Sequence, residues 1–274
     1  MPELAEVQTI VSDLHHLVGY TFKSIQTDWP KALSPSLSAF QKNLIGKKII
    51  AVHRRAKYIA IELSDDWILL IHLRMSGRLF IREKGHKADT HVHVCFEFDR
   101  NKELRFSDQR KFGRAWMLKK SDYKTLPEIK KLGQEPLDPN FTVDDFKARF
   151  RSKKGKLKAK LLDQTLLAGI GNIYADEISF AAGLHPQSSL ENLSESDLEN
   201  LYHEMRRILE YAVQARGSSV GEFMDAFGNI GSAQKMHYAY GRKGLPCKVC
   251  GTTLHGIKVA QRGTSFCPKC QELK

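Results

Sequence analysis

Apolar side chains recur at intervals of three and four residues over the first eighteen positions of the chain. They are Leu4, Val7, Val11, Leu14 and Val18. This spacing places them on one face of an amphipathic helix, so we predict a helix over residues 4–18. Pro2 stands just before this helix, and Glu3 and Glu6 fall in its first turn, where proline and carboxylates are favoured.

Between about residues 21 and 118 the pattern shortens to alternation typical of strands. The segments are rich in β-branched and aromatic residues, and turn signals such as residues 64–66 and 99–101 separate them. The predicted strands are Lys48–His53, Lys57–Leu63, Trp67–His72, Arg78–Arg82, His91–Phe98 and Arg114–Leu118. Six or more strands at this spacing favour a sandwich or a barrel.

Residues 126–140 contain three prolines and a glycine, and we predict that they form a linker. Helical periodicity follows this segment. The predicted helices are Val143–Arg151, Leu157–Thr165, Ile173–Ala182 and Ser194–Ala215. The pattern therefore predicts a mixed α+β protein with a strand-rich domain over residues 1–125 and a helical domain after the linker.

The chain carries 43 Lys and Arg against 31 Asp and Glu, a net charge of +12. An excess of this size attracts polyanions, of which nucleic acid is the commonest, although charge alone does not separate DNA from RNA or anionic lipid. No apolar run reaches the roughly 18 residues of a membrane span, and the start of the chain is acidic, unlike a secretory signal. We expect a cytoplasmic, nucleoid-associated protein with no membrane partner.

Four of the five cysteines form two close pairs, Cys247 with Cys250 and Cys267 with Cys270. Cysteines three positions apart lie at the two ends of a tight turn, so both thiolates can face one ion. Without a secretory signal, two such pairs predict a tetrahedral zinc site rather than disulfides. We therefore predict one structural Zn²⁺ within residues 241–274. Cys95 stands apart in a strand pattern and is predicted to be an inert buried thiol.

A glycine-containing turn, Ala168–Gly171, precedes Asn172, which is a favourable helix N-cap residue. Five lysines lie just upstream at positions 153, 154, 156, 158 and 160. Free amides at a helix start bind phosphate, so this segment fits a phosphate-binding turn. It fits an ordinary helix connection with a solvated lysine face equally well, and the pattern alone leaves both interpretations open.

Motifs along nearly the whole chain resemble those of the formamidopyrimidine-DNA glycosylase family, in the family's order. They are Met1–Val7, Arg55–Tyr58, His72–Gly77, Asp108–Gly113, Leu132–Asp138, Leu162–Gln164, Gly169–Ala175 and Gln261–Gln271. The opening reads Glu-Leu rather than the Glu-Gly of the endonuclease VIII branch, which favours the branch that acts on oxidised purines. Ala5 departs from the pattern, because the family usually has proline there.

The resemblance implies a fold and an activity. The expected domains are a catalytic β-sandwich with an N-terminal helix over residues 1–125, a helix–two-turns–helix DNA-binding domain over 141–240 and a β-hairpin zinc finger over 241–274. The expected activity is excision of 8-oxoguanine and formamidopyrimidines from duplex DNA, followed by β- and δ-elimination at the abasic site. We expect a monomer that holds damaged double-stranded DNA in a basic cleft between the domains, with zinc as the one cofactor.

The resemblance also implies catalytic roles for four residues. Removal of Met1 would expose Pro2 as a secondary amine that attacks the sugar C1′ and forms a Schiff base. Glu3 would move protons during base release and ring opening. Lys57 would contact a phosphate and donate a proton near the lesion, and Arg262 would hold the phosphates beside it. From the residues alone, Pro2 and Glu3 fit simple helix-start chemistry, and Lys57 fits a solvated strand edge.

Eight further residues are expected to contact DNA. The resemblance implies backbone contacts by His72, His91, Lys153, Lys158 and Asn172, although a histidine in a strand is often purely structural. A stacked base is out of an enzyme's reach, so the damaged nucleotide must rotate out of the duplex. Met75, Arg110 and Phe112 resemble the family's triad that fills the space it leaves, the alternative being two core residues and a surface ion pair.

Two other functions stay open from the sequence. One is an oxidised-pyrimidine glycosylase of the endonuclease VIII type on the same scaffold. The other is a non-catalytic protein that binds damaged DNA through the finger and the helix turn. The presence of both Pro2 and Glu3 argues against the second.

Overall fold

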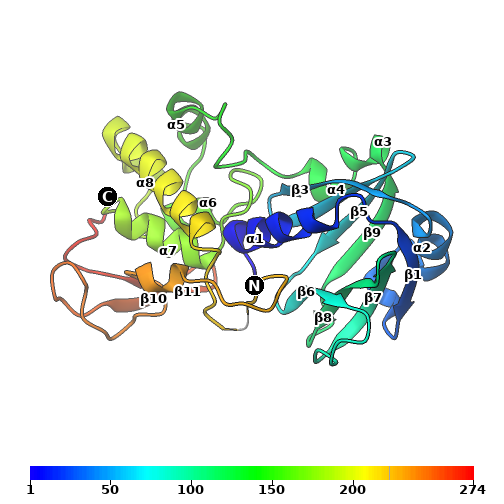
Figure 1. Ribbon diagram of the computed structural model, residues 1–274. Coiled ribbons are helices and arrows are strands. Elements are labelled where there is room, and N and C mark those ends of the chain that lie inside the picture. Colours follow the sequence, from blue (N-terminus) through cyan, green and yellow to red (C-terminus); the bar gives the residue numbers. More distant parts are fainter. Residues whose placement is uncertain (222) are drawn as a thin grey trace. The chain divides into compact units, whose positions relative to one another are not determined.

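The computed structural model describes residues 1–221 and 223–274, and they form two compact units (Figure 1). The first unit is Met1–Lys130 with Ala215–Gln234, and the second is Lys131–Gln214 with Lys235–Lys274. This division differs from the predicted domains, which placed residues 215–234 with the helices. Those residues belong to the first unit because Arg216 donates to both oxygens of Asp13, at 2.8 and 2.9 Å, and Ile81 N donates to Ala226 O at 2.8 Å.

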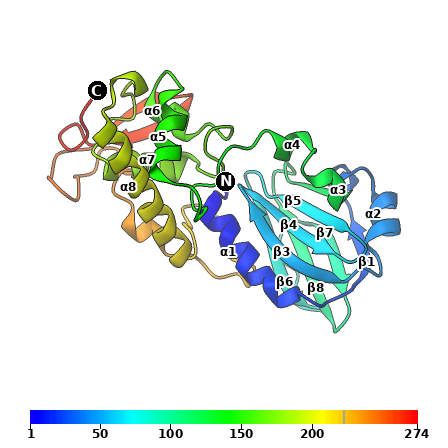
Figure 2. The same cartoon turned by 90° about the horizontal axis from the view of Figure 1, so that it is seen from above.

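Two β-sheets make up most of the first unit and overlap as layers in Figure 2. One has the order β1-β7-β8-β6, from Phe22–Thr27, Val92–Phe98, Lys102–Asp108 and Gly77–Glu83. The other has the order β2-β9-β5-β4-β3, from Leu33–Ser34, Arg114–Lys119, Trp67–His72, Tyr58–Leu63 and Ile49–Arg55. All the pairings are antiparallel except that of β2 with β9. Apolar residues of both sheets share one core, so the predicted sandwich is confirmed.

Strand β8 was not predicted. Charged residues alternate with Leu104 and Phe106 in it, so the segment does not look like a buried strand. The structure shows how those charges are accommodated. Arg105 donates to Glu103 at 2.8 Å and to Asp89 at 3.0 Å, and both Glu103 and Arg105 are buried. Burial of a charge costs little only when it is paired and hydrogen-bonded, a condition that this network meets. Strands β1 and β2 were missed as well.

The helices of the first unit are short. Helix α1 covers Leu4–Leu14 and is followed by a 3₁₀ turn at His15–Leu17, so the predicted helix over residues 4–18 ends earlier than expected. The apolar face of α1 packs into the sandwich core beside β3 and β4. The remaining segments are the 3₁₀ turn Pro30–Ala32 and the helices α2 at Leu37–Leu44, α3 at Lys120–Tyr123 and α4 at Pro127–Lys130.

The second unit is helical, with a β-hairpin at its C-terminal end. Its helices are α5 at Val143–Arg151, α6 at Leu157–Leu161, α7 at Asn172–Ala181 and α8 at Glu195–Gln214. Helix α8 packs on α5 and α7, and the hairpin of β10 (His255–Val259) and β11 (Arg262–Phe266) packs on α7 through β11. Short 3₁₀ turns lie at Leu190–Asn192 and Ala233–Met236, the latter crossing the boundary between the units. Among the described residues, no helix is long and apolar enough to cross a membrane.

Candidate active site and nucleic-acid interface

The two candidate catalytic residues at the N-terminus are buried at the start of α1. Pro2 directly precedes Glu3, which is the N-cap of the helix and only 3% exposed. Glu3 and Glu6 form a reciprocal capping box, in which the Glu3 amide donates to Glu6 Oε2 at 2.8 Å. Met1, in contrast, is 51% exposed. The helix therefore holds the backbone at Pro2 in a defined place rather than on a free tail.

Glu6 is a further buried carboxylate beside Pro2 and Glu3, and the sequence did not single it out. Its Oε1 accepts a hydrogen bond from Ser218 N at 2.6 Å, so one buried carboxylate joins the start of α1 to residues 215–234. Gly217 is needed for this contact, because it has φ +76° and a Cβ there would lie 3.0 Å from Glu6 Cγ. The Glu3-x-x-Glu6 spacing was the available signal, since a capping box uses that interval.

Lys57 and His72 lie at the same end of the five-stranded sheet, because Tyr58, the residue after Lys57, pairs with His72 between β4 and β5. Lys57 occupies the tight turn between β3 and β4, after Ala56 with φ 52°, and is only 6% exposed. The alternative of a solvated strand-edge lysine is therefore wrong. Burial first, and then the charges of Arg74 and Lys57, lower the pKa of His72 to about 3. His72 is consequently neutral at physiological pH in this structure.

The imidazole of His72 also has structural partners. Its Nδ1 accepts a hydrogen bond from Arg74 N at 2.9 Å, and its ring packs edge-on against Tyr58 at 4.4 Å between centroids. A neutral ring that accepts at Nδ1 carries its proton on Nε2. His72 therefore has one N–H, at Nε2, with which it could donate a hydrogen bond to DNA.

Met75, Arg110 and Phe112 come together on one surface of the first unit, as the resemblance implied. Met75 lies between β5 and β6, and the other two lie between β8 and β9. Arg110 Nη1 is 3.3 Å from Met75 Sδ, and its Cζ is 4.7 Å from the centroid of the Phe112 ring. Met75 is 44% and Phe112 47% exposed, which overturns the alternative that they are core residues.

His91 and Lys153 are exposed, His91 in a turn and Lys153 in an irregular segment. His91 has φ 57° and precedes β7, so the predicted strand His91–Phe98 begins one residue later. Lys153 follows α5 on the second unit. Both side chains are open to solvent.

Lys158 departs from the expectation, because it is completely buried. Its Nζ lies 2.6 Å from Asp176 Oδ1, and it donates to Thr264 Oγ1 at 2.7 Å and to Gly263 O at 3.1 Å. Two hydrogen bonds and one ion pair therefore compensate for the burial of the ammonium group. Burial raises the pKa of Asp176 to about 6, and Lys158 opposes that rise. Because no part of the Lys158 side chain is exposed, the predicted phosphate contact by Lys158 is wrong.

Arg262 lies at the tip of the hairpin, and Asn172 contacts the residue that follows it, Gly263. Arg262 is the first residue of β11 and is exposed, directly after a two-residue turn in which Ala260 and Gln261 have φ 48° and 61°. Asn172 Nδ2 donates to Gly263 O at 3.0 Å. Gly171, not Asn172, is the N-cap of α7, so the predicted cap was wrong and the Asn172 amide supports the hairpin instead.

Three family profiles match consecutive parts of the chain. They are described as the formamidopyrimidine-DNA glycosylase N-terminal domain over residues 1–115, the formamidopyrimidine-DNA glycosylase H2TH domain over 132–224 and the zinc finger found in FPG and IleRS over 244–273. A formamidopyrimidine-DNA glycosylase of Herpetosiphon aurantiacus is 42% identical over 276 residues, covering 99% of this chain and 100% of that protein. The chain belongs to the formamidopyrimidine-DNA glycosylase family.

Solved structures of this family have the same fold. Lactococcus lactis Fpg in complex with DNA containing an abasic site is 35% identical with a TM-score of 0.91, over 98% of this chain and 99% of that one. The wild-type Lactococcus lactis Fpg with DNA containing N7-benzyl-Fapy-dG is 36% identical with a TM-score of 0.92, over 99% and 100%. The architecture of a sandwich, a helical domain and a finger is therefore that of the glycosylase family.

The four cysteines of the family's zinc finger converge on one point. All their sulfur atoms lie within 4.8 Å of one another, with Cys247 and Cys270 at 3.9 Å and Cys250 and Cys267 at 3.5 Å. Four thiolates at the Zn–S distance of about 2.3 Å stand about 3.8 Å apart in a tetrahedron, so the cluster fits one Zn²⁺. Four cysteine ligands leave no open position for water or substrate. The zinc is therefore structural, as predicted.

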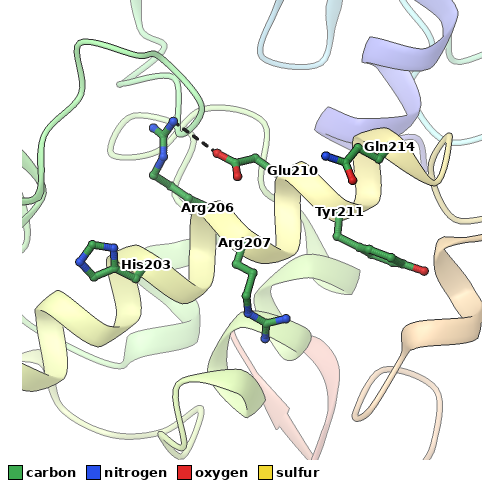
Figure 3. A pocket seen from close by; sticks show the side chains of 6 residues that line it. All are labelled: His203, Arg206, Arg207, Glu210, Tyr211 and Gln214. Atoms are coloured by element: carbon green, nitrogen blue, oxygen red, sulfur yellow. Dashed lines mark ion pairs between the residues drawn. The ribbon is translucent and has the colours of Figure 1, made fainter.

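The surface also has a hollow of about 430 Å³ on α8 of the glycosylase's helical unit (Figure 3). It is lined by His203, Arg206, Arg207, Glu210, Tyr211 and Gln214, and Arg206 pairs with Glu210 at 3.4 Å. Arg206 also donates to the backbone oxygens of Pro136 and Asp138, each at 3.1 Å. This side chain thus holds the end of the predicted linker on α8, and the predicted site residues lie elsewhere.

Proposed function

We propose that this chain is a bifunctional DNA glycosylase and abasic-site lyase that excises oxidised purines, 8-oxoguanine and formamidopyrimidines, from duplex DNA. The observation that carries the proposal is the Pro2-Glu3 opening, buried and capped at the start of α1, in a chain that belongs to the glycosylase family along its whole length. Its partner is damaged double-stranded DNA, and its cofactor is the zinc of the finger.

The proposed chemistry uses the amine of Pro2 after removal of Met1. Its nitrogen attacks C1′ of the damaged nucleotide, the C1′–N bond to the base breaks, and the departing base takes up a proton. Ring opening then leaves an iminium between Pro2 and the sugar. Loss of the 3′ and then the 5′ phosphate completes the β- and δ-eliminations. Glu3, the buried residue that follows Pro2 in the chain, moves protons between these steps.

Cations and donors on both units support the DNA in this proposal. Lys57 contacts a phosphate and donates a proton near the lesion, and Arg262 holds the phosphates beside it. His91, Lys153 and Asn172 bind the backbone, and His72 contributes its Nε2–H alone. Arg262 and Lys153 are exposed and suit this task, because phosphate contacts supply most of the affinity of a protein for duplex DNA.

The Met75, Arg110 and Phe112 cluster supports recognition of the base opposite the lesion. Methionine is flexible enough to fill an irregular gap in the stack, and phenylalanine can wedge between base pairs. Arginine has only donors, which suit the N3 and O2 acceptors of an orphan cytosine. Adenine places an amino donor beside N1, so one arm of the guanidinium would stay unpaired. Excision should therefore be favoured opposite cytosine.

A panel of defined lesions opposite each base tests this function. The parent enzyme should cleave 8-oxoguanine and formamidopyrimidine strands most rapidly opposite cytosine and slowly opposite adenine. Arg110→Ala should lose most of this preference, about 1–3 kcal/mol or roughly ten- to hundredfold, because a bidentate contact of this kind discriminates by that amount. Single-turnover cleavage rates on matched duplexes give the measurement.

The same panel contains the results that would contradict the proposal. Faster cleavage of oxidised pyrimidines than of oxidised purines would favour the endonuclease VIII type of activity. Binding without cleavage of any lesion would favour a non-catalytic damage-binding protein. An Arg110→Ala enzyme that still discriminates as sharply as the parent would show that another group reads the opposite base.

Salt titration separates the exposed from the buried lysine. Lys153→Ala should weaken binding to damaged and undamaged duplex alike and flatten the slope of log affinity against log salt by about one unit, since each neutralised phosphate contributes about −0.9. Lys158→Met should keep the parent slope but melt earlier, because Asp176 is left buried without its cation, at a cost of about 3–5 kcal/mol. A flattened slope in Lys158→Met would instead make Lys158 a phosphate contact.

The net charge of +12 also supports association with the nucleoid in the cell.

A further inference from the structure

Asp108 lies beneath the two loops that carry the residues proposed to enter the duplex. We call these the insertion loops: residues 73–76, which carry Met75, and residues 109–113, which carry Arg110 and Phe112. Asp108 ends strand β8 and is fully buried, at 0% exposure. A buried carboxylate is costly unless its oxygens are hydrogen-bonded, so its partners show what it does.

Each oxygen of the Asp108 carboxylate accepts two hydrogen bonds. Oδ1 accepts from Ser76 Oγ at 2.6 Å and from Arg110 N at 3.2 Å. Oδ2 accepts from Phe112 N at 2.9 Å and from Gly113 N at 2.6 Å. A carboxylate has about four lone-pair positions, and these four donors match them. One side chain therefore joins the first insertion loop to the second.

The backbone around Asp108 lets the second insertion loop approach the carboxylate closely. A Cβ on Gly113 would lie 2.3 Å from Phe106 Cζ and 3.0 Å from Asp108 Oδ2, so only glycine lets the chain approach the carboxylate. The backbone N–H of Asp108 donates to His91 O at 2.9 Å, which ties the turn of another proposed DNA contact to the same residue. Lys111 in the second loop has φ 53°, a conformation that neighbouring contacts must hold in place.

We propose that Asp108 is the positioning residue of the inserted side chains, setting the separation between Met75 and the Arg110–Phe112 pair before DNA binds. The inference rests on the proposed function of these three residues. Their side chains are too exposed for core packing to order them, so the order must come from the backbone of the loops. Preorganised loops lower the entropic cost of insertion and fix which base atoms the guanidinium reaches.

The isosteric change Asp108→Asn tests this role. The amide NH₂ cannot accept hydrogen bonds, so two of the four donors lose their acceptor whichever way the side chain turns. We expect kcat/KM for 8-oxoguanine opposite cytosine to fall about ten- to hundredfold, the effect of losing two hydrogen bonds to a charged acceptor. Most of the cytosine-over-adenine preference should be lost with it. Borohydride trapping at a preformed abasic site should stay within about twofold of the parent, because the chemistry at Pro2 is untouched.

Asp99→Asn is the matched control, since Asp99 also accepts a backbone hydrogen bond within the sandwich, from Thr21 N at 3.0 Å, but lies in a different turn. It should keep the parent rate and preference. If Asp108→Asn does not fold, Ser76→Ala tests the role of Asp108 instead. This variant removes one of the four hydrogen bonds to the Asp108 carboxylate. An intermediate loss of preference in Ser76→Ala supports the role, and the full parent preference overturns it.

Arg110→Ala, assayed in parallel, separates the two proposals. If Arg110→Ala loses the preference and a folded Asp108→Asn keeps both rate and preference, Asp108 has no positioning role. If Arg110→Ala itself keeps the preference, the function proposed for the inserted residues fails, and the inference about Asp108 fails with it. Loss in both variants, with trapping retained, is the result that we expect.

Discussion

An enzyme that retains Met1 or carries an N-terminal tag is expected to lose borohydride trapping on abasic-site DNA completely. In such an enzyme the nitrogen of Pro2 is part of a peptide bond, whose lone pair is delocalised and cannot attack a sugar. The new terminal amine would start from Met1, which is 51% exposed, whereas Pro2 is buried against the start of α1. The reactive group is thereby moved away from Glu3.

The amine of a lysine side chain does not easily replace the amine of Pro2 as the nucleophile. An α-amino group titrates near 7.8 and a lysine near 10.4, so at neutral pH the terminus offers roughly 400-fold more free amine. Trapping is measured by the covalent protein–DNA band on a denaturing gel after borohydride reduction. A C-terminal tag is the control and should leave the band unchanged. Pro2→Gly still has an α-amine and is expected to trap, so it does not test the assignment. Undiminished trapping by the N-terminally tagged enzyme would show that another amine attacks.

Removal of zinc is expected to weaken binding to duplex DNA by about two orders of magnitude, or ~2.7 kcal/mol. The metal organises the finger whose hairpin presents Arg262, and a structural zinc contributes folding energy directly. Cys247→Ser should release the ion and lower the affinity for damaged and undamaged duplex alike. Metal release into a chromophoric chelator and fluorescence anisotropy of labelled duplex give the two measurements.

Cys95→Ser is the matched control for this experiment. Cys95 lies in β7, outside the four-cysteine cluster, and burial raises the pKa of its thiol to about 12. Its replacement should leave both the zinc content and the affinity unchanged. If the metal-free Cys247→Ser protein binds DNA as tightly as the parent, the finger takes no part in holding the duplex.

Local sequence was sufficient for those features that depend on neighbours along the chain. The three- and four-residue spacing of Leu4, Val7, Val11 and Leu14 predicted α1, and alternation predicted most strands of the sandwich. The two Cys-x-x-Cys pairs predicted the zinc cluster, because three-residue spacing places both sulfurs of a pair at one tight turn. The capping interval from Glu3 to Glu6 is local in the same way.

Tertiary structure decided the roles of residues whose partners are distant in the sequence. Lys158 looked like one more basic residue in a lysine-rich segment, but Asp176, Gly263 and Thr264 bury it as an ion pair. His72 looked like a backbone contact, but burial beside Lys57 and Arg74 keeps it neutral.

Strand β8 and the function of Asp108 depend on distant partners in the same way. Glu103 and Arg105 can be buried in β8 only because Asp89 completes their network, and Asp108 joins loops that are about thirty residues apart, as its bond to Ser76 shows. Spacing and side-chain type in the sequence therefore determined α1, most strands of the sandwich and the zinc cluster. The structure alone decided which charges are paired and buried and which remain exposed to meet DNA, because desolvation and pairing depend on neighbours that only the folded chain brings together.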